Sequence, residues 1–472
     1  MDTDRKLGNR SLRDRDGGSR HGAAGNRSQP ATKCLPEPGI AGDQGTAGER
    51  DKAGNEALGT RPPGKAGAEI WGRMRAYRAL FGHRGVPRLF AAVALTRIAP
   101  PILNLSLLLA AAAAHGYAIG GLVLTGFSVA LAVCVPVSGR LVDRFRPRAV
   151  LLALLVVHVL ACAATVLALA AQAGPALLIA AAIGVGGSAP PAAPVIRASW
   201  PAILPAEQLR TAYALDAVLN ETMVVGGLLV VSGLLALAAP VAAVGVAGVC
   251  TALGVLIAVP GLRAPAERVR TRGVRGFLGP LAQGRVRVLL GMAAADMVAF
   301  GCLLVGVSAL ATSAAAPEAS GVLLSVFSAG AVFSALCYGM RERDTAARPR
   351  LVALHAVSAL LLAIVAATSG PVLAGVVLLL LGLVSGMRDT LHQLVLGSAA
   401  AAEHRTEAFA WLTTCMWGGN GIGTAVAGQL VGWSGGSHRA ALLTAALAAG
   451  AASVLALMLR ARAGAPQVQR QS

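Results

Sequence analysis

Long, nearly uninterrupted apolar stretches recur along this chain of 472 residues, as at 89–114, 149–171 and 351–367. Their lengths approach the roughly 20 residues that a helix needs to cross about 30 Å of hydrocarbon. The bilayer core offers no water to the backbone, and runs of about twenty rather than about ten residues favour helices over barrel strands. Charged residues make up only 13% of the chain, against about a quarter in soluble domains. The sequence therefore predicts an all-α integral membrane protein.

The apolar segments predict twelve transmembrane helices in two sets of six. The first set lies at about 88–114, 118–139, 148–171, 175–199, 211–238 and 241–262. The second set lies at about 287–312, 319–340, 350–368, 371–396, 406–433 and 438–460. A polar segment separates the sets, so the predicted fold is two six-helix bundles.

The polar parts of the chain set the predicted domain boundaries. Residues 1–87 are rich in Gly, Ser, Arg and Asp, which predicts a disordered cytoplasmic tail. A translation start at Met74 is an alternative, because a basic segment and the first span follow it directly. The remaining predicted parts are an N-terminal bundle at 88–262, a cytoplasmic linker at 263–286, a C-terminal bundle at 287–460 and a cytoplasmic tail at 461–472.

Arginines fall in alternate loops between the predicted spans. The other set of loops holds little charge beyond Glu318 and Arg439. Because short cytoplasmic loops collect positive charge, we expect both termini on the cytoplasmic side of the cell membrane. The basic loops hold Arg144, Arg146, Arg148, Arg210, Arg263, Arg268, Arg270, Arg272, Arg275, Arg341, Arg343, Arg348, Arg350 and Arg405.

The formal net charge of +19 raises the question of nucleic-acid binding, because basic patches recognise phosphate. Here the basic residues lie in tails and alternate loops, and only 4% of residues are aromatic, which leaves few platforms for stacking bases. The sequence shows no Gly-rich phosphate loop and no His, Cys or carboxylate cluster with metal or nucleophile spacing. We therefore expect no nucleic-acid partner, no enzymatic activity, no metal and no cofactor.

The loop after the second predicted span carries a recognisable pattern. A glycine is followed, after three intervening residues, by an acidic and basic pair and then by further basic residues: Gly139, Asp143, Arg144 and Arg148. In this pattern the chain resembles the major facilitator superfamily, although Arg146 stands where that family has a second glycine. The resemblance implies that the loop joins the two halves at the cytoplasmic side. Asp143 would face the amino end of the eleventh span, where a helix dipole favours an anion.

Three further stretches, at 197–201, 212–218 and 407–411, look like actinobacterial members of the superfamily. Many of its drug and proton antiporters have a Gly-Pro pair in the fifth span, where this chain has Gly226 and Gly227. The resemblance implies a twelve-span transporter of the drug or metabolite efflux type, and we expect it to be a monomer.

Arg97, His158, Glu221 and Asp296 each lie about nine or ten residues into a predicted span, roughly 15 Å deep. A charge at the bilayer centre costs at least about 2.5 kcal/mol, so such groups normally face a watery cavity or each other. The resemblance implies a cavity lined by the first, fourth, seventh and tenth spans, with Arg97 and Asp296 in opposite halves. We expect Glu221 to approach Arg97 and to carry protons, and His158 to be a packed neutral histidine.

Other polar residues of the first span have two interpretations. Asn104, one helical repeat beyond Arg97, either contacts the substrate or packs as an amide. Pro100 and Pro101 are expected to break or kink the helix.

Arg197, Arg388 and Asp389 lie toward the cytoplasmic ends of the fourth and tenth predicted spans, where long side chains can reach water. Asp216 is about 140° from Glu221 around its helix, so one narrow face cannot hold both. We expect Asp216 to form a cytoplasmic network with Arg197. Fixed ion pairs that only hold helices together are the alternative for all these charges.

The predicted function is secondary transport with alternating access, in which a small amphipathic or apolar molecule leaves the cell as protons enter. Uptake by proton symport is the first alternative. A receptor or scaffold that resembles a transporter but moves nothing is the second. The predicted partners are the small molecule, protons and the lipid bilayer.

Overall fold

The computed structural model describes residue 78 and residues 80–83, 85–237, 240–262, 279–339, 347–400 and 405–459. These residues belong to one compact unit, 63–472, and their regular elements are all helices. The predicted tails and most of the predicted linker lie outside the described residues, so their boundaries and disorder stay predictions.

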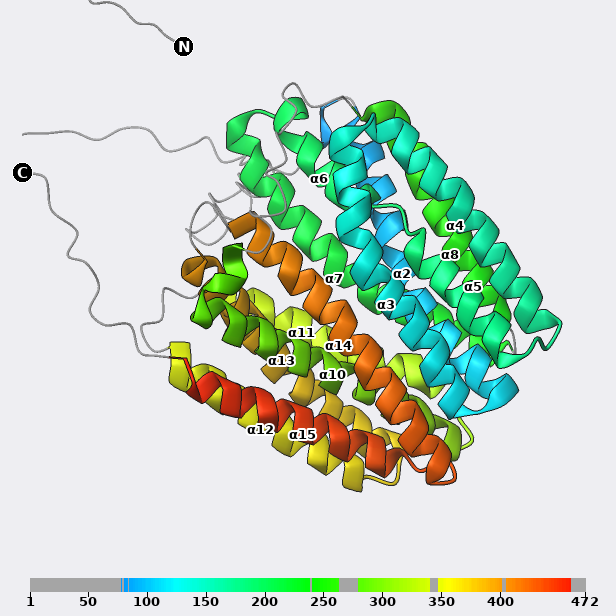
Figure 1. Cartoon of the computed structure of the whole chain (residues 1–472). Helices are drawn as coiled ribbons and strands as arrows, with labels where there is room; N and C mark the ends of the chain where they lie inside the picture. The colour runs from blue at the N-terminus through cyan, green and yellow to red at the C-terminus, as the bar shows by residue number, and fades with distance from the viewer. Residues whose placement is uncertain are drawn as a thin grey trace, which may run out of the picture. The chain divides into compact units, whose positions relative to one another are not determined.

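Seven helices make the six spans of the first half (Figure 1), because two consecutive helices, α5 and α6, form the fourth span. In chain order the helices are α2 (Val86–His115), α3 (Tyr117–Arg144), α4 (Pro147–Ala170), α5 (Pro175–Gly187), α6 (Ala192–Ile203), α7 (Ala206–Ala236) and α8 (Pro240–Ala258).

Six helices make the second half, and the short 3-10 helices η1 (Val259–Gly261) and η2 (Gly279–Ala282) lie between the halves in sequence. The predicted fold of twelve helical spans in two six-span bundles is confirmed. The helices of the second half are α10 (Gly284–Ser313), α11 (Ala319–Gly339), α12 (Ala347–Ala367), α13 (Pro371–Ala399), α14 (Arg405–Trp433) and α15 (His438–Leu457).

One span, α14, is more polar than the rest. Among the described residues, 11 spans are long and apolar enough to cross a membrane, whereas α14 has the length but carries several glycines, Asn420 and Gln429. It packs between α3 and α10, and its polar groups pair with α3: Asn420 Nδ2 donates to Ser128 Oγ at 2.9 Å, and Thr125 Oγ1 donates to the Gly421 carbonyl at 2.9 Å. These polar groups therefore bind the other half instead of facing lipid.

The fourth span differs from its prediction as one continuous helix. A break between Gly187 and Ala192 contains Pro190 and Pro191. Adjacent prolines lack N–H donors and force the preceding residue toward an extended backbone, so the helix ends there and restarts.

The first span differs in the opposite sense. Pro100 and Pro101 lie inside α2, which continues unbroken to His115. Gly227 of α7 packs so closely against Pro101 that a β-carbon on the glycine would lie 2.7 Å from the proline ring. Membrane helices tolerate proline where neighbouring helices cover the freed backbone groups, and α7 is such a neighbour.

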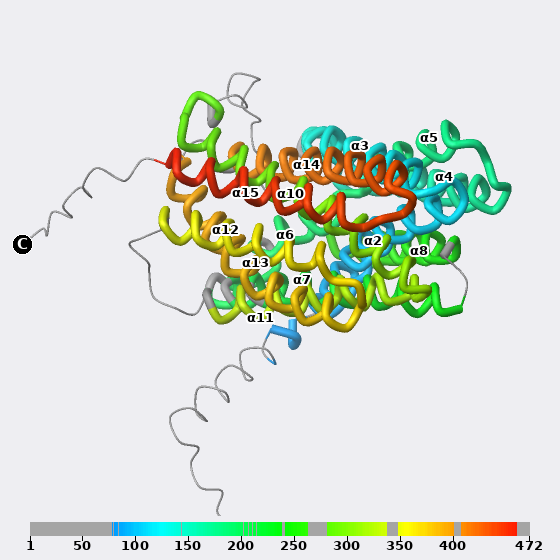
Figure 2. The backbone as a smooth tube through the Cα atoms, turned by 90° about the horizontal axis from the view of Figure 1, so that it is seen from below, coloured from blue at the N-terminus to red at the C-terminus, as the bar shows by residue number. Residues whose placement is uncertain are grey.

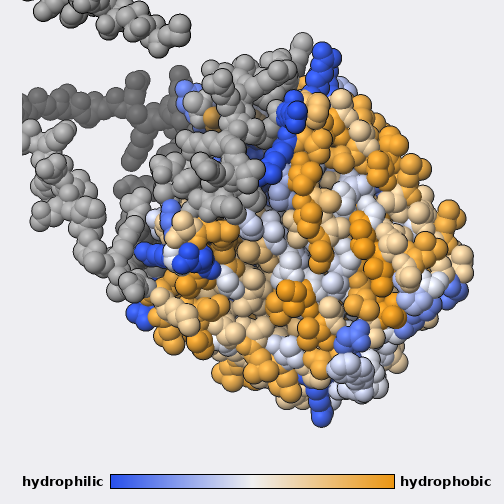
Figure 3. All heavy atoms as spheres, in the orientation of Figure 1, coloured by the Kyte–Doolittle hydropathy of each residue, from blue (hydrophilic) through white to orange (hydrophobic). Residues whose placement is uncertain are grey.

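The two halves meet mainly through α3 against α14 and through α7 against α11, and Figure 2 shows α14 lying along α3. On the outer flanks lie α4 and α8 of the first half and α12 and α15 of the second (Figure 1). Large apolar side chains on these helices are exposed, such as Leu160 on α4 and Leu447 on α15. The surface in Figure 3 is accordingly dominated by apolar residues, which suits contact with lipid tails.

The helix ends define two ends of the molecule. We call the end that holds His115, Tyr117 and Thr312 the closed end, because the halves contact each other there. Tyr117 Oη shares a hydrogen bond with Thr312 Oγ1 at 2.8 Å, and Ser232 Oγ donates to the Glu318 carbonyl at 2.7 Å. The opposite end, where α3 ends and α14 begins at Arg405, is the basic end.

The apolar core is continuous at the closed end and divided at the basic end. One cluster, which includes Leu108 and Leu310, joins both halves near the closed end. Toward the basic end each half has its own cluster, around Trp200 in the first half and around Leu396 in the second. Among the described residues, the buried apolar cores of the two halves therefore merge toward the closed end and stay separate toward the basic end.

Gly121→Ala is expected to lower the midpoint of thermal unfolding of the purified protein in detergent. The added methyl group would overlap the Thr424 carbonyl of α14, and such overpacking costs about 1–3 kcal/mol. Gly450→Ala is the matched control, because nothing lies within 4 Å of its β-carbon position, and alanine there favours the helix by about 0.5–1 kcal/mol. Equal midpoints for the two variants would contradict the close approach of α3 and α14.

Candidate functional site

A fully buried carboxylate in the first half binds two guanidinium groups. The side chain of Asp216 on α7 is 0% exposed, and its Oδ2 accepts hydrogen bonds from Arg97 Nη2 of α2 at 3.0 Å and from Arg197 Nε of α6 at 2.7 Å. Arg97 Nη1 also donates to the Asp216 carbonyl oxygen at 2.9 Å. One carboxylate thus holds three helices, and its two positive partners leave the cluster with a formal charge of +1.

Depth along the helices explains why Arg97 meets Asp216 instead of Glu221. Helices α2 and α7 both begin at the basic end, and Arg97 and Asp216 each lie about three helical turns from it. Glu221 lies more than one turn further along α7, roughly 7.5 Å deeper. The sequence predicted that this span starts at about residue 211, five residues after its actual start at Ala206. With that start, Glu221 would lie at the same depth as Arg97. The structure therefore pairs Arg97 with a different carboxylate, and joins the expected partners Asp216 and Arg197.

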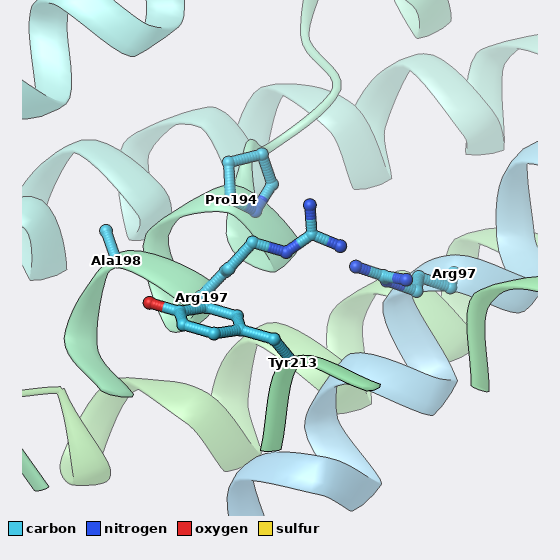
Figure 4. A pocket seen from close by; sticks show the side chains of 5 residues that line it. All are labelled: Arg97, Pro194, Arg197, Ala198 and Tyr213. Atoms are coloured by element: carbon cyan, nitrogen blue, oxygen red, sulfur yellow. The ribbon is translucent and has the colours of Figure 1, made fainter. Parts of the chain in front are cut away.

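A cavity of about 320 Å³ lies beside this cluster. It is lined by Arg97, Pro194, Arg197, Ala198 and Tyr213, all from the first half. Figure 4 shows the two guanidinium groups pointing toward each other, with the Tyr213 ring beside Arg197. The Arg197 side chain is 48% exposed, so its charge is available to a solute. The cavity therefore offers a cationic edge and apolar or aromatic walls.

Glu221 is a partly buried carboxylate on the same helix. Its Oε1 accepts a hydrogen bond from Asn220 Nδ2 at 3.1 Å, and no residue that the structure describes forms an ion pair with it. Its charge interacts with Arg97 in the same half and with Asp389 in the other half. Protonation of Glu221 would leave no ion-pair partner without a counter-charge, whereas protonation of Asp216 would leave two arginines, the nearly buried Arg97 and the half-exposed Arg197, without theirs.

A second charged cluster lies in the other half. Asp296 on α10 contacts two cations or potential cations: its Oδ2 is 3.0 Å from His355 Nε2 of α12, and its Oδ1 is 3.4 Å from Arg388 Nη1 of α13. The arginine contact is an ion pair without hydrogen-bond geometry. Arg388 Nη1 also donates to Ser358 Oγ at 3.3 Å. The cluster thus joins three helices of the second half, as the first cluster joins three helices of the first.

Arg388 extends the second cluster toward the first half. Its Nε and Nη2 donate to Asp389 Oδ1, both at 3.1 Å, and the Asp389 side chain is 50% exposed. Arg388 is buried, although its predicted position near a span end suggested that it reaches water. The reason is again a boundary: α13 continues to Ala399, so Arg388 lies about three helical turns from that end.

Arg97, Glu221 and Asp296 therefore do not form one cluster. The first and third have separate ion-pair partners, and Glu221 lies apart from both pairs. His355 and His392 are not among the site residues predicted from the sequence. For His392 a signal was available, because it lies three positions after Asp389 and so shares its face of the helix.

The remaining predicted site residues have simpler surroundings. Asn104 is partly buried on α2, and its Oδ1 has no hydrogen-bond partner among the described residues. Gly139 and Arg144 lie near the end of α3 in open surroundings. Arg148 Nη2 donates to the Leu262 carbonyl at 2.7 Å, which ties α4 to the segment after α8 within the first half. The side chain of Asp143 lies outside the described part of the chain, so the joining of the halves by this loop stays a prediction.

Metal binding finds no support in the part of the chain that the structure describes, where no group of three or more His, Cys, Asp or Glu residues is placed to hold an ion. The chemistry on offer is that of guanidinium groups, carboxylates and imidazoles. These groups bind anions and protons.

No protein-family model matches this chain, and no curated protein matches it. Solved structures do share its fold. The nucleoside transporter NupG superposes with a TM-score of 0.61 at 15% identity, over 79% of this chain and 97% of that one. The human organic anion transporter MFSD10 (TETRAN) superposes with a TM-score of 0.56 at 17% sequence identity, over 78% of this chain and 98% of that one. An auto-inhibited peptide transporter of the POT family superposes with a TM-score of 0.56 at 13% sequence identity, over 82% of this chain and 99% of that one. These likenesses show that the chain has the major facilitator fold.

Asp216→Asn is expected to lower the thermal unfolding midpoint of the purified protein strongly, because it leaves Arg97 and Arg197 together without a counter-charge. Removing one partner of a buried ion pair costs about 3–5 kcal/mol. Asp389→Asn makes the same chemical change at a half-exposed carboxylate whose arginine keeps Asp296, so we expect a loss of about 1 kcal/mol or less. If both variants unfolded at one temperature, the shared role of Asp216 would be refuted.

Proposed function

We propose that this protein is a secondary active transporter that works by alternating access. The division of the core carries the proposal: both halves share one core at the closed end, have separate cores at the basic end, and hold a charged cluster at each point of division. Two bundles in this arrangement can rock about α3 with α14 and α7 with α11 and expose a central site to one side at a time. The transport of nucleosides, peptides and organic anions by proteins of similar fold supports this function.

We assign the basic end to the cytoplasm of the cell, in the plasma membrane, because positive charge collects in cytoplasmic loops. Both chain termini then lie inside, and the separated cores face the cytoplasm. The structure described above would be an inward-facing state of a monomer. Asp143, Arg144 and Arg148 would lie at the cytoplasmic gate.

We propose protons as the coupling ion and Glu221 as their carrier in the first half. The support is its position: a partly buried carboxylate without an ion-pair partner among the described residues, near Arg97 and Asp389. A proton on Glu221 changes the net charge next to the cavity by one unit. The binding free energy of a substrate in the cavity therefore depends on whether Glu221 is protonated. Such a dependence is the requirement for coupling.

The cavity beside Arg197 supports a small amphipathic substrate. The guanidinium is suited to an anionic or strongly accepting group, since it can donate two parallel hydrogen bonds to it. Pro194, Ala198 and the Tyr213 ring provide contact for an apolar portion. Asn104 is a further polar group on α2, with an unpartnered oxygen that can accept from a substrate donor.

Export is the direction we propose, with proton entry as the driving reaction. Uptake by symport uses the same parts, and the direction of substrate movement in vesicles with an imposed pH gradient distinguishes the two. A receptor that resembles a transporter would bind the compound without flux.

Glu221→Gln is expected to abolish substrate movement driven by a pH gradient and to leave exchange of substrate across the membrane intact. Glutamine keeps the size and the hydrogen bond to Asn220 but carries no proton. The measurement is flux in proteoliposomes, with a compound taken from a susceptibility and uptake screen of a deletion strain. The control is Glu207→Gln, the same change at an exposed position in the first turn of the same helix.

Each outcome of that assay decides between the candidate functions. Loss of driven transport with exchange retained supports proton coupling at Glu221. Unchanged driven transport in Glu221→Gln would contradict Glu221 as the carrier. Binding without any flux in the wild-type protein would contradict transport itself and favour the receptor.

Arg197→Gln is expected to raise the substrate concentration for half-maximal exchange by about tenfold or more, because a charge-assisted hydrogen bond contributes about 1.5–3 kcal/mol. Arg197→Lys keeps the charge but loses the planar fork, so it should show a smaller increase. Stability is measured in parallel, since Arg197 also binds Asp216. Equal affinity in the wild-type protein and Arg197→Gln, with both folded, would exclude Arg197 from substrate binding.

A further inference from the structure

The imidazole of His355 faces a hydrogen-bond acceptor at both of its nitrogens. Nδ1 lies 2.6 Å from the Leu351 carbonyl oxygen, one turn back along α12, and Nε2 lies 3.0 Å from Asp296 Oδ2. A backbone carbonyl cannot donate, so Nδ1 has to carry a hydrogen. A neutral imidazole with its hydrogen on Nδ1 has only a lone pair at Nε2, and that lone pair would face a carboxylate.

We propose that His355 and Asp296 together bind one proton and form a proton-binding site in the second half of the protein. The proton lies either on Nε2, as an imidazolium and carboxylate pair, or on Asp296 Oδ2, as a carboxylic acid that donates to the imidazole. Both forms contain the same atoms and the same net charge. Without this proton, a lone pair and an anion would face each other in a fully buried position, which is the costly arrangement.

The charge balance of the surrounding cluster is compatible with this proton. Asp296 and Asp389 contribute two negative charges and Arg388 contributes one positive charge, which leaves −1 among these side chains. The proton on the His355 and Asp296 pair makes the cluster neutral. Because Asp389 is half exposed, water also screens its charge, and the requirement for the proton comes from the two contacts of the His355 ring.

His158 in the first half provides an internal comparison. Its Nδ1 lies 3.2 Å from the Val185 carbonyl, an acceptor, but its Nε2 lies 3.7 Å from the thiol of Cys162, which can donate. A neutral imidazole with the hydrogen on Nδ1 satisfies both contacts. His158 and His355 are both buried, and of these two only His355 requires an additional proton.

Ionisable groups near His355 come from two other helices, α10 and α13. Asp296 comes from α10, and α13 contributes Arg388, Asp389 and His392. The ionisable residues of α15 that the structure describes, His438 and Arg439, lie at the closed end, where His438 binds the Thr368 carbonyl.

His392 is a second buried imidazole whose charge would interact with this pair. Its side chain is buried, with 4% exposed, and neither ring nitrogen has a hydrogen-bond partner among the described residues. Its charge interacts with both Asp296 and His355.

The site deepens the proposed proton coupling and in that respect rests on it. Arg388 connects Asp296 to Asp389, and Asp389 interacts with Glu221 of the first half. The proton carriers of the two halves thus belong to one electrostatic network. The presence of the bound proton itself does not depend on transport.

Nitrogen NMR of the full-length protein in lipid bilayers, with ¹⁵N-labelled histidine, tests the proposal. At about pH 8 an ordinary histidine, with a pKa of about 6.5, is neutral. We expect one imidazolium signal that disappears in His355→Gln, or, if the proton lies on the acid, a protonated-carboxyl band in the infrared spectrum that disappears in Asp296→Asn. His158→Gln is the control and should remove only a neutral signal.

Neutral signals for all histidines together with no infrared band that depends on Asp296 would overturn the proposal. If the substituted proteins do not fold, the wild-type protein with ¹³C-labelled aspartate and ¹⁵N-labelled histidine replaces them. Dipolar coupling between an imidazolium nitrogen, or a neutral nitrogen beside a carboxylic acid, and an aspartate carboxyl carbon then supports the site, and its absence refutes it. A bound proton in a protein without flux would leave this site standing while the proposed transport failed.

Discussion

Buried charge decides where the core of this protein is continuous and where it divides. Arg97 lies between Val93, in the core of the first half, and Ala99, in the shared core. Asp296 lies in the same way between Ala293, in the core of the second half, and Ala299, in the shared core. A membrane protein cannot leave such groups against lipid, because each would cost several kcal/mol. Ion pairs within each half satisfy them, and neither cluster needs an ion pair from the other half. The halves can therefore separate at the basic end with both clusters intact.

The two clusters correspond in position but differ in chemistry. Arg97 and Asp296 each lie about three helical turns from the start of the first helix of their half. The fourth spans contribute Arg197 and Arg388. This placement is what internal repeats produce. The first cluster has a surplus positive charge beside a cavity, and the second contains the His355 and Asp296 pair that we propose shares one proton. The first half is thus suited to bind an anionic group of a substrate, and the second half is suited to bind a proton. The two repeats have similar geometry but different binding functions.

Much of the fold could be predicted from the sequence, because a long apolar segment in a lipid bilayer has to form a helix that satisfies its own backbone hydrogen bonds. The twelve spans required only segment lengths, and even the polar α14 was found, since its glycines and amides are spaced along an otherwise apolar run. Side-chain partners were harder, because a boundary error of about five residues, as at Ala206, moves a carboxylate by roughly 7.5 Å, more than one helical turn. That error exchanged Asp216 for Glu221 as the partner of Arg97. The role of His355 was inaccessible, because a histidine's protonation depends on which atoms face its two nitrogens, and here the decisive carboxylate comes from a distant helix.

Repulsion between two carboxylates across the interface links protonation to the separation of the two halves. Glu221 and Asp389 belong to different halves, and their charges repel when both are ionised. A repulsion of about 1.4 kcal/mol would shift a two-state equilibrium roughly tenfold. In the proposed cycle, ionised Glu221 favours separated halves at the basic end, and a proton on Glu221 removes the repulsion and permits that end to close. Because Arg388 links Asp389 to Asp296, the proton shared with His355 sets how much of the Asp389 charge Arg388 can neutralise. Proton occupancy in the second half therefore modulates the repulsion that the first half experiences.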